Sequence, residues 1–317
     1  MRRGLARDYD AAMLTVAALY HFTRFPDPES LCDPLRALCR EAGVKGTLLI
    51  AGEGVNGTIA GPRAGIDRAL AHLRALPGCE TLVWKESLAQ TMPFSRMKVR
   101  LKQEIVTMGQ PDVDPVAAVG HYVKPADWND LIASPDVAVI DTRNDYEVAI
   151  GTFEGAIDPQ TRTFRDFPAW WAAEKDRFAG KRIAMFCTGG IRCEKATSYL
   201  VSQGVQDVFH LQGGILKYLE DVPADQSLWQ GECFVFDGRV SVGHGLQQGD
   251  FTSCGACRRP VSADDRAHPA YEAGVACPAC VDEYDAEDRA RFRERQKQVQ
   301  LARARGTRHM GEQDGTL

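Results

Sequence analysis

The chain has 317 residues, of which 44% are hydrophobic and 26% charged, and its formal net charge is −5. This composition is typical of a globular protein with room for two or three domains, and no stretch approaches the roughly 18 consecutive apolar residues that a membrane helix needs. The opening MRRGLARDYD leads into no apolar run of signal-peptide length, so we expect a cytoplasmic protein. The negative charge means that any affinity for RNA must come from local basic patches.

The first segment, residues 11–107, alternates patterns typical of strands and helices. The predicted elements, in chain order, are a strand at 14–22, a helix at 29–43, two strands around a glycine-rich turn within 46–61, a helix at 61–78 and a strand at 80–87. Pro62 near the start of the second helix and Gly78 after its end suit helix termini. The order βαββαβ indicates a ferredoxin-like domain, which we assign to residues 1–110.

A basic stripe follows within residues 95–109, where cations alternate with apolar residues. The cations are Arg96, Lys98, Arg100 and Lys102, and the apolar residues are Met97, Val99 and Leu101. Because strand side chains alternate between faces, the cations are expected to line one face, with a spacing that suits contact with phosphates. The alternative is an ordinary solvated strand face.

The second segment, residues 120–224, begins after the Pro/Gly-containing stretch at 109–120. Short apolar runs end before polar or glycine-rich residues at 135–143, 181–190 and 206–214, and helical patterns lie between them at 165–178 and 193–204. Strands that alternate with helices predict an α/β domain with a parallel sheet covered on both faces and functional loops at the carboxyl ends of its strands.

One of these strands leads into the loop Cys187-Thr188-Gly189-Gly190-Ile191-Arg192, which precedes a helix expected to open at Cys193 or Glu194. Such a loop can turn its backbone N–H groups inward and bind an anion. A thiol at its first position is stabilised as thiolate by those N–H groups, the helix dipole and Arg192. We therefore predict that Cys187 is catalytic and that residues 188–192 bind substrate. The alternative is a small apolar residue that ends a core strand.

Cys193, six residues after Cys187, has two interpretations. It could resolve an oxidised Cys187, or it could be a helix residue without chemistry, which we favour.

The third segment, residues 225–317, contains a predicted hairpin at 232–242 around Asp237-Gly238, a dipeptide favoured in type I′ turns. Two CxxC pairs then provide four thiols: Cys254, Cys257, Cys277 and Cys280. Their spacing predicts a tetrahedral structural zinc site, because four protein ligands leave no open position for a substrate. An iron–sulfur cluster and unligated thiols are the alternatives.

The tail from 289 to 308 carries eight Lys/Arg against a single acid, Glu294. A basic helix or arm of this kind can follow a phosphate backbone, and it can equally be a solvated terminus.

The loop CTGGIRCEKA resembles the active-site loop of the rhodanese superfamily, in which a cysteine opens a six-residue loop ahead of a helix. Upstream, IDTRNDYEVAIGTFEGAI (140–157) resembles the other rhodanese signature. The matching residues are Asp141, Arg143, Glu147, Gly151, Gly155 and Ala156. Thr152 departs from it, since many rhodaneses have histidine there.

Together with AGEGVNGTIAG (51–61) and PFSRMKVRLKQEIVTMG (93–109), the order of the segments resembles the rhodanese-domain tRNA uridine hydroxylases over nearly the whole chain. That resemblance implies oxygen-dependent formation of 5-hydroxyuridine at wobble position 34 of tRNA, with Cys187 as the essential cysteine and molecular oxygen as co-substrate. The electron donor is left open.

Two other functions compete with hydroxylation. The first is a rhodanese-type sulfurtransferase that carries a persulfide on Cys187. The second is a zinc-containing RNA-binding or regulatory module with an inert rhodanese fold.

Overall fold

The computed structural model describes residues 13–90 and 92–306 and divides into two compact units, Met1–Ile105 and Val106–Leu317. The basic start of the chain and Arg308 of the basic tail lie outside the described residues. Within the described ranges, no helix is both long and apolar enough to span a bilayer.

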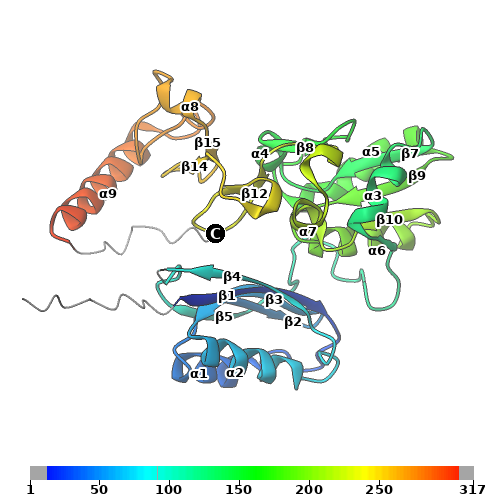
Figure 1. Cartoon of the computed structure of the whole chain (residues 1–317), viewed down its shortest axis with the longest axis horizontal. Helices are drawn as coiled ribbons and strands as arrows, with labels where there is room; N and C mark the ends of the chain where they lie inside the picture. Colours follow the sequence, from blue (N-terminus) through cyan, green and yellow to red (C-terminus); the bar gives the residue numbers. More distant parts are fainter. Residues whose placement is uncertain (1–12, 91, 307–317) are drawn as a thin grey trace, which may run out of the picture. The chain divides into compact units, whose positions relative to one another are not determined.

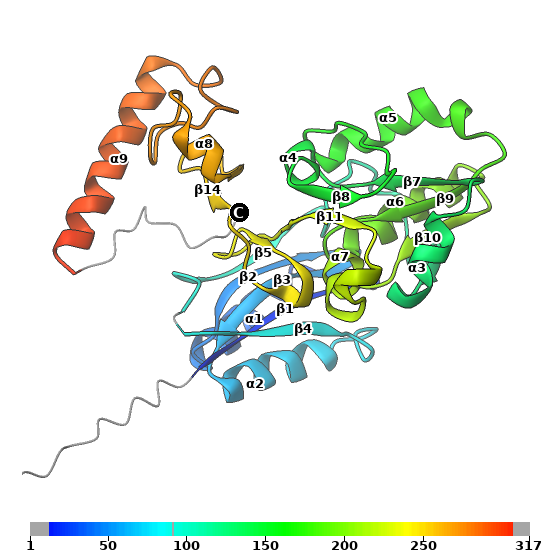
Figure 2. The same ribbon diagram turned by 45° about the horizontal axis from the view of Figure 1, so that its top comes forward.

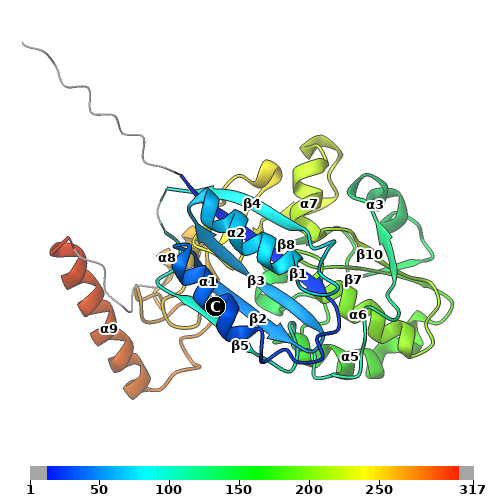
Figure 3. The ribbon, with the colours of Figure 1, turned by 90° about the horizontal axis from the view of Figure 1, so that it is seen from below.

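The first unit has the ferredoxin-like arrangement that the sequence predicts. Its elements are β1 (Leu14–Phe22), α1 (Cys32–Glu41), β2 (Lys45–Ala51), β3 (Gly54–Gly61), α2 (Arg63–Arg74), β4 (Trp84–Ala89) and β5 (Met97–Leu101). The sheet order is β4-β1-β3-β2-β5, and β5 lies parallel to β2 at one edge. Helices α1 and α2 lie side by side on one face of this sheet (Figures 1 and 3).

The core of this unit lies between the sheet and the two helices. Leu48 and Ile50 of β2 are fully buried there, together with Leu35 and Cys39 of α1. Gly57 of β3 allows β2 to pass close by, since a Cβ atom at this position would lie 2.0 Å from the carbonyl oxygen of Thr47. The sheet therefore buries one face against the helices, whereas the side chains on its other face are half-buried or exposed.

The second unit contains the predicted parallel sheet. Its elements up to residue 221 are β6 (His121–Val123), α3 (Pro125–Ile132), β7 (Val137–Asp141), α4 (Asp145–Val148), β8 (Gly151–Phe153), α5 (Phe167–Glu174), β9 (Arg182–Phe186), α6 (Ile191–Ser202), β10 (Val208–Leu211) and α7 (Gly214–Asp221). The strand order β6-β10-β9-β7 is parallel throughout. Short 3-10 helices flank α5 at Phe164–Asp166 and Lys175–Phe178.

Each central strand of this sheet contributes to two separate cores. In β9, Ile183 and Met185 pack into one cluster with Trp171, whereas Ala184 and Phe186 pack into the other with Trp128. A strand buried on both faces reads as an unbroken apolar run, which is why the sequence shows one before the loop at 187.

The remaining elements in the described ranges are five short strands and two helices, apart from two 3-10 turns. They are β11 (Trp229–Gly231), β12 (Cys233–Phe234), β13 (Ser241–Val242), β14 (Thr252–Ser253), β15 (Pro260–Val261), α8 (Ala263–Ala267) and α9 (Ala286–Ala304), with 3-10 turns at Ala224–Gln226 and His244–Leu246. Strand β11 pairs with β8, and Figure 2 shows α9 as a long single helix.

The predicted hairpin at 232–242 exists as β12 and β13, but its turn differs from the prediction. A type I′ turn needs positive φ at both central residues, and neither Asp237 nor Gly238 has it, whereas Val240 does. The connection is a wider loop closed by a hydrogen bond from the Val235 N–H to the Val240 carbonyl.

Candidate active site

Cys187 directly follows β9, which lies between β7 and β10 in the parallel sheet. Its Sγ atom accepts a hydrogen bond from the backbone N–H of Gly190 at 3.1 Å, and further hydrogen bonds come from the backbone N–H and thiol of Cys193. The first turn of α6 begins at Ile191, earlier than the predicted Cys193 or Glu194, so Arg192 and Cys193 belong to the helix. The anion cradle is thus a tight turn joined to a helix N-terminus.

The first two carbonyl groups of the turn accept hydrogen bonds from helix α7. The N–H groups of Ile215 and Leu216 at the start of α7 donate to the carbonyl oxygens of Cys187 and Thr188, at 2.9 and 3.1 Å. Gly214 makes this approach feasible, because its φ is +66° and a Cβ atom there would lie 2.5 Å from the Cys187 oxygen. With these carbonyls turned toward α7, N–H groups of the turn are available to the sulfur.

Arg192 is anchored by a buried carboxylate. Its two terminal nitrogens donate to the two oxygens of Glu147 at 2.6 and 2.7 Å, and the Glu147 side chain is fully buried. Glu147 also accepts the backbone N–H of Asn144 at 3.0 Å and the hydroxyl of Thr188 at 3.3 Å. The guanidinium is therefore held beside the turn rather than free to leave it.

The other acid–arginine pair of the rhodanese signature has a structural role. Arg143 and Asp141 form a fully buried ion pair with an N–O distance of 2.6 Å, and Arg143 also donates to the carbonyls of Glu147 and Gly151. Thr152, in the place where many rhodaneses have histidine, donates its hydroxyl to Asp141 at 3.0 Å. This network fixes the backbone around α4, which carries Glu147.

Opposing effects set the pKa of Cys187. Burial raises it, because a charged sulfur is poorly solvated there, and the hydrogen bonds from Cys193 and Gly190 together with the charge of Arg192 lower it to about 6 from 9.0. Burial and the adjacent Cys187 sulfur raise the pKa of Cys193. At neutral pH the arrangement favours a thiolate at Cys187 and a neutral, hydrogen-bond-donating thiol at Cys193.

The other predicted substrate-binding residues lie around this sulfur. Cys187 itself is only 1% exposed and Thr188 is buried, whereas Gly189 and Ile191 are half-buried. A Cβ atom at Gly189 would meet nothing within 4 Å, so there is open space on that side of the turn. The sulfur is therefore nearly closed to solvent, and the open space lies on the Gly189 side of the turn.

The hairpin of β12 and β13 packs against this site, which the sequence patterns do not predict. Buried Cys233 of β12 packs in the same cluster as Phe186, the residue before Cys187. The guanidinium carbon of Arg192 lies 5.9 Å from the ring centroid of Phe236. Nothing in the local sequence links this hairpin to residue 187, because the contact depends on how β11 pairs with β8.

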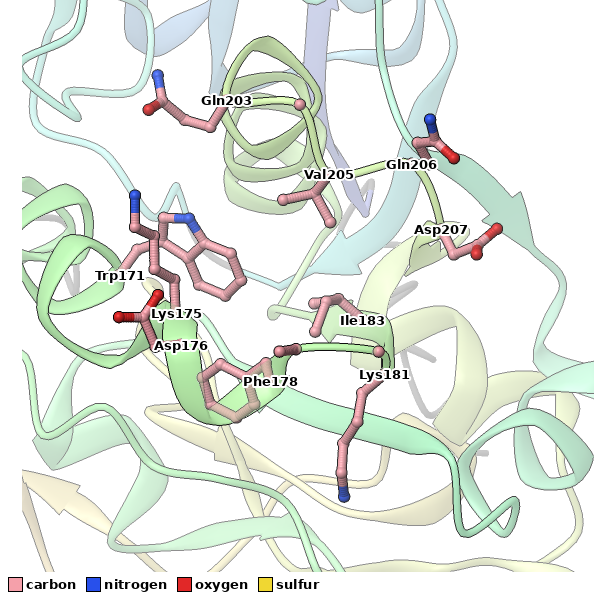
Figure 4. A pocket seen from close by; sticks show the side chains of 13 residues that line it. Trp171, Lys175, Asp176, Phe178, Lys181, Ile183, Gln203, Val205, Gln206 and Asp207 are labelled. Carbon is pink, nitrogen blue, oxygen red and sulfur yellow. The ribbon is translucent and has the colours of Figure 1, made fainter.

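A surface hollow of about 440 Å³ lies at the opposite end of β9 (Figure 4). Its lining includes Trp171, Phe178, Ile183, Val205 and Asp207. These positions surround the amino end of β9 and the turn before β10, whereas Cys187 follows the carboxyl end of β9. The hollow is therefore separate from the cysteine turn.

The four C-terminal cysteines meet the geometry of a single tetrahedral ion. All four sulfurs lie within 4.8 Å of one another, with separations of 3.9 Å for Cys254–Cys280, 3.7 Å for Cys257–Cys277 and 3.6 Å for Cys277–Cys280. A zinc ion with Zn–S bonds of about 2.3 Å places its thiolates roughly 3.8 Å apart. A multi-iron cluster interposes several atoms between its thiolates and holds them further apart.

Helix α9 contributes to this cysteine site rather than extending as a free arm. Arg295 donates to the carbonyl oxygens of Gly255 and Gly274, beside the two knuckles, and Arg293 pairs with Glu272 at 2.6 Å. Part of the basic charge that the sequence offers for RNA is thus used within the protein.

Comparisons with known proteins agree with this architecture. A family described as UPF0176 acylphosphatase like domain matches residues 14–105, and the Rhodanese-like domain family matches residues 124–221. The parallel sheet and the cysteine-headed turn define a rhodanese-like protein.

Relatives that match over nearly their whole length show which family the chain belongs to. Proteins named tRNA uridine(34) hydroxylase are 70% identical over 298 residues in Ruegeria pomeroyi, covering 94% of this chain and 99% of the relative, and 66% identical over 302 residues in Jannaschia sp., covering 95% and 100%. One from Caulobacter vibrioides is 60% identical over 307 residues, covering 95% and 97%. The chain belongs to the tRNA uridine(34) hydroxylase family.

Proposed function

We propose that this protein hydroxylates uridine 34 of tRNA to 5-hydroxyuridine in the cytoplasm, with molecular oxygen as co-substrate and the Cys187 thiolate as nucleophile. The observation that carries the proposal is the Gly190 N–H, 3.1 Å from the Cys187 sulfur, in a chain 70% identical to a relative named tRNA uridine(34) hydroxylase. A thiolate held by backbone amides is a nucleophile at neutral pH.

The first step is addition of the thiolate to C6 of the uracil. The S–C6 bond forms, and the C5=C6 electron pair moves to C5 and the C4 carbonyl as an enolate. Arg192 is the nearby cation fixed by Glu147 at 2.6 Å, so it can stabilise this negative charge without reorganisation. The amides of residues 188–191 are the proposed supports for the pyrimidine.

Oxygen then enters at C5. The C5 electron pair attacks one atom of molecular oxygen, and the resulting peroxide anion is cleaved by a two-electron donor with three protons, of which the later loss of the C5 proton returns one; this releases one water molecule and leaves a hydroxyl on C5. Loss of the C5 proton expels the Cys187 thiolate and restores the double bond. The overall balance is uridine, oxygen, two electrons and two protons to 5-hydroxyuridine and water.

The helix-free face of the first unit supports binding of the tRNA backbone. Strand pairing puts Lys85, Ala18, Thr58, Thr47 and Lys98 in one row across the sheet, and Leu49 and Arg100 pair in the next. Leu48 and Val99, which alternate with these residues along β2 and β5, point to the opposite face and are buried with the residues of α1. None of the described side chains in these rows is acidic, and burial together with Arg96 and Arg100 lowers the pKa of Lys98, as expected for crowded cations.

The metal proposed for the four-cysteine site is zinc with a structural role. Thiolate ligands in tetrahedral array suit this ion, and four protein ligands leave no coordination position for oxygen or substrate. Cys254, Cys257, Cys277 and Cys280 would hold it and stabilise the turns to which α9 is attached.

The function is tested by nucleoside mass spectrometry of tRNA from cells that lack this protein. Supplying the wild-type chain is expected to restore 5-hydroxyuridine at position 34, and no restoration would contradict the proposal. Incubation of the purified protein with thiosulfate and cyanide provides the counter-test, because rapid thiocyanate formation would favour a sulfurtransferase.

A further inference from the structure

Phe236 is an exposed aromatic residue in the loop between β12 and β13. Its side chain is 40% exposed, although it lies two residues after Phe234, which is 4% exposed. A single exposed apolar residue needs no explanation by itself. Phe236, however, contacts both a packed aromatic residue and the cation beside Cys187.

The ring of Phe236 is supported from within the hairpin. Phe234 meets it edge to face, with ring centroids 5.1 Å apart and an interplanar angle of 84°. Phe234 in turn contacts Tyr146 of α4, with centroids 5.3 Å apart. The exposed ring is thus held by Phe234, which is itself packed against Tyr146, and this reduces the entropy lost when a ligand stacks on it.

The hairpin also lies beside the reactive sulfur. Arg192, whose charge acts on Cys187, has its guanidinium carbon 5.9 Å from the Phe236 ring centroid. Cys233, three residues before Phe236, packs in the same buried cluster as Phe186, the residue before Cys187. An aromatic face and a fixed cation therefore border the same turn.

We propose that Phe236 is the stacking surface for the pyrimidine that reacts at Cys187. A base attacked at C6 must leave the anticodon stack, and the stacking energy given up there has to be replaced. Aromatic side chains do this for any base through its π-face, and since Arg192 lies over one face of the Phe236 ring, the base would stack on the other face. This inference rests on the proposed hydroxylase function and adds the residue that holds the base.

The test compares binding of two anticodon stem-loop RNAs, one with uridine at position 34 and one abasic there. Wild-type protein is expected to bind the uridine RNA about tenfold more tightly, as one base–aromatic stack implies. Phe236→Ala and Phe236→Leu should lose this preference without changing affinity for the abasic RNA. Phe236→Trp should keep the preference, and thermal unfolding of each variant checks the fold.

Two results would overturn the inference. One is a full preference for uridine in Phe236→Ala, and the other is equal loss of affinity for both RNAs, which indicates only a packing role. Formation of 5-hydroxyuridine in cells separates the two proposals. If the wild type forms it and Phe236→Ala forms it equally well, stacking alone fails; if the wild type forms none, the hydroxylase proposal and the stacking inference fall together.

Discussion

The fully buried carboxylate of Glu147 accepts hydrogen bonds from both terminal nitrogens of Arg192, at 2.6 and 2.7 Å. The pair joins α4 to the first turn of α6, so it connects the two signature segments of the rhodanese-like domain. Because Arg192 lowers the pKa of Cys187, the same ion pair positions a charge that favours the reactive form of the sulfur.

The ion pair predicts that substitutions of Arg192 and Glu147 have coupled effects on the free energy of unfolding. Arg192→Met or Glu147→Gln alone leaves the partner charge buried without compensation, and each is expected to lower the free energy of unfolding by about 3–5 kcal/mol. The double variant should lose clearly less than the sum of the two. Urea unfolding measures the cycle, and additive losses would show that the pair is not energetically coupled.

The environment of Cys187 predicts an unusual pH dependence of its alkylation. Iodoacetamide labelling, located by peptide mass spectrometry, should show a midpoint near pH 6 instead of 9.0. Cys193→Ala removes a hydrogen bond to the sulfur and should move the midpoint upward. A midpoint near 9 in the wild type would contradict the proposed thiolate, and Cys187→Ser is the control for labelling of other cysteines.

The lowered pKa of Cys187 also predicts that the free energy of unfolding rises with pH. The pKa of Cys187 is lower in the folded protein than in the unfolded chain, so the unfolded chain binds the proton between about pH 6 and 9. The contribution of this thiolate to the free energy of unfolding is therefore complete above about pH 9 and is lost as the pH falls to 6. The slope in this window should be smaller in Cys187→Ser, which has no thiol to ionise there.

The metal site predicts one bound ion for each chain and no visible colour. Elemental analysis of the purified protein should give one zinc equivalent, and Cys254→Ser should lose it. Helix α9 should then be cleaved more readily by protease, because the carbonyls of Gly255 and Gly274 that hold Arg295 are no longer ordered. Visible absorption with stoichiometric iron would instead indicate an iron site.

The helix-free sheet face predicts salt-dependent affinity for tRNA. Lys98→Glu and Arg100→Glu should weaken binding and reduce the slope of log affinity against log salt by about one for each phosphate that is no longer bound. Arg68→Glu, on α2 at the opposite side of the sheet, is the matched control and should change little. Equal effects of all three variants would argue against a specific RNA face.

Much of this fold can be predicted because its periodicities are simple. The strand predicted at 14–22 has the bounds of β1, and the predicted helices differ from α1 and α2 only at their ends. The strand β9 and the turn at Cys187 stand out because an apolar strand buried on both faces runs directly into a glycine-bearing turn. Such features are local, so a single sequence can show them.

The rest depends on contacts between distant residues. The ion pair of Arg192 joins residues 45 positions apart, and the Phe236 loop reaches the site through strand pairing of β11 with β8. Strands of two or three residues, such as β12 and β6, carry too few positions for a pattern. The predicted type I′ turn is wrong because a wider loop overrides the local preference of Asp237-Gly238.

The proposed reaction requires the Cys187 sulfur for chemistry but not for tRNA binding. The decisive measurement is 5-hydroxyuridine at position 34, determined by mass spectrometry in cells that carry only Cys187→Ser, beside the affinity of the purified variant for unmodified tRNA. We predict no 5-hydroxyuridine with nearly unchanged affinity. Wild-type levels of 5-hydroxyuridine from this variant would contradict a nucleophilic role for Cys187.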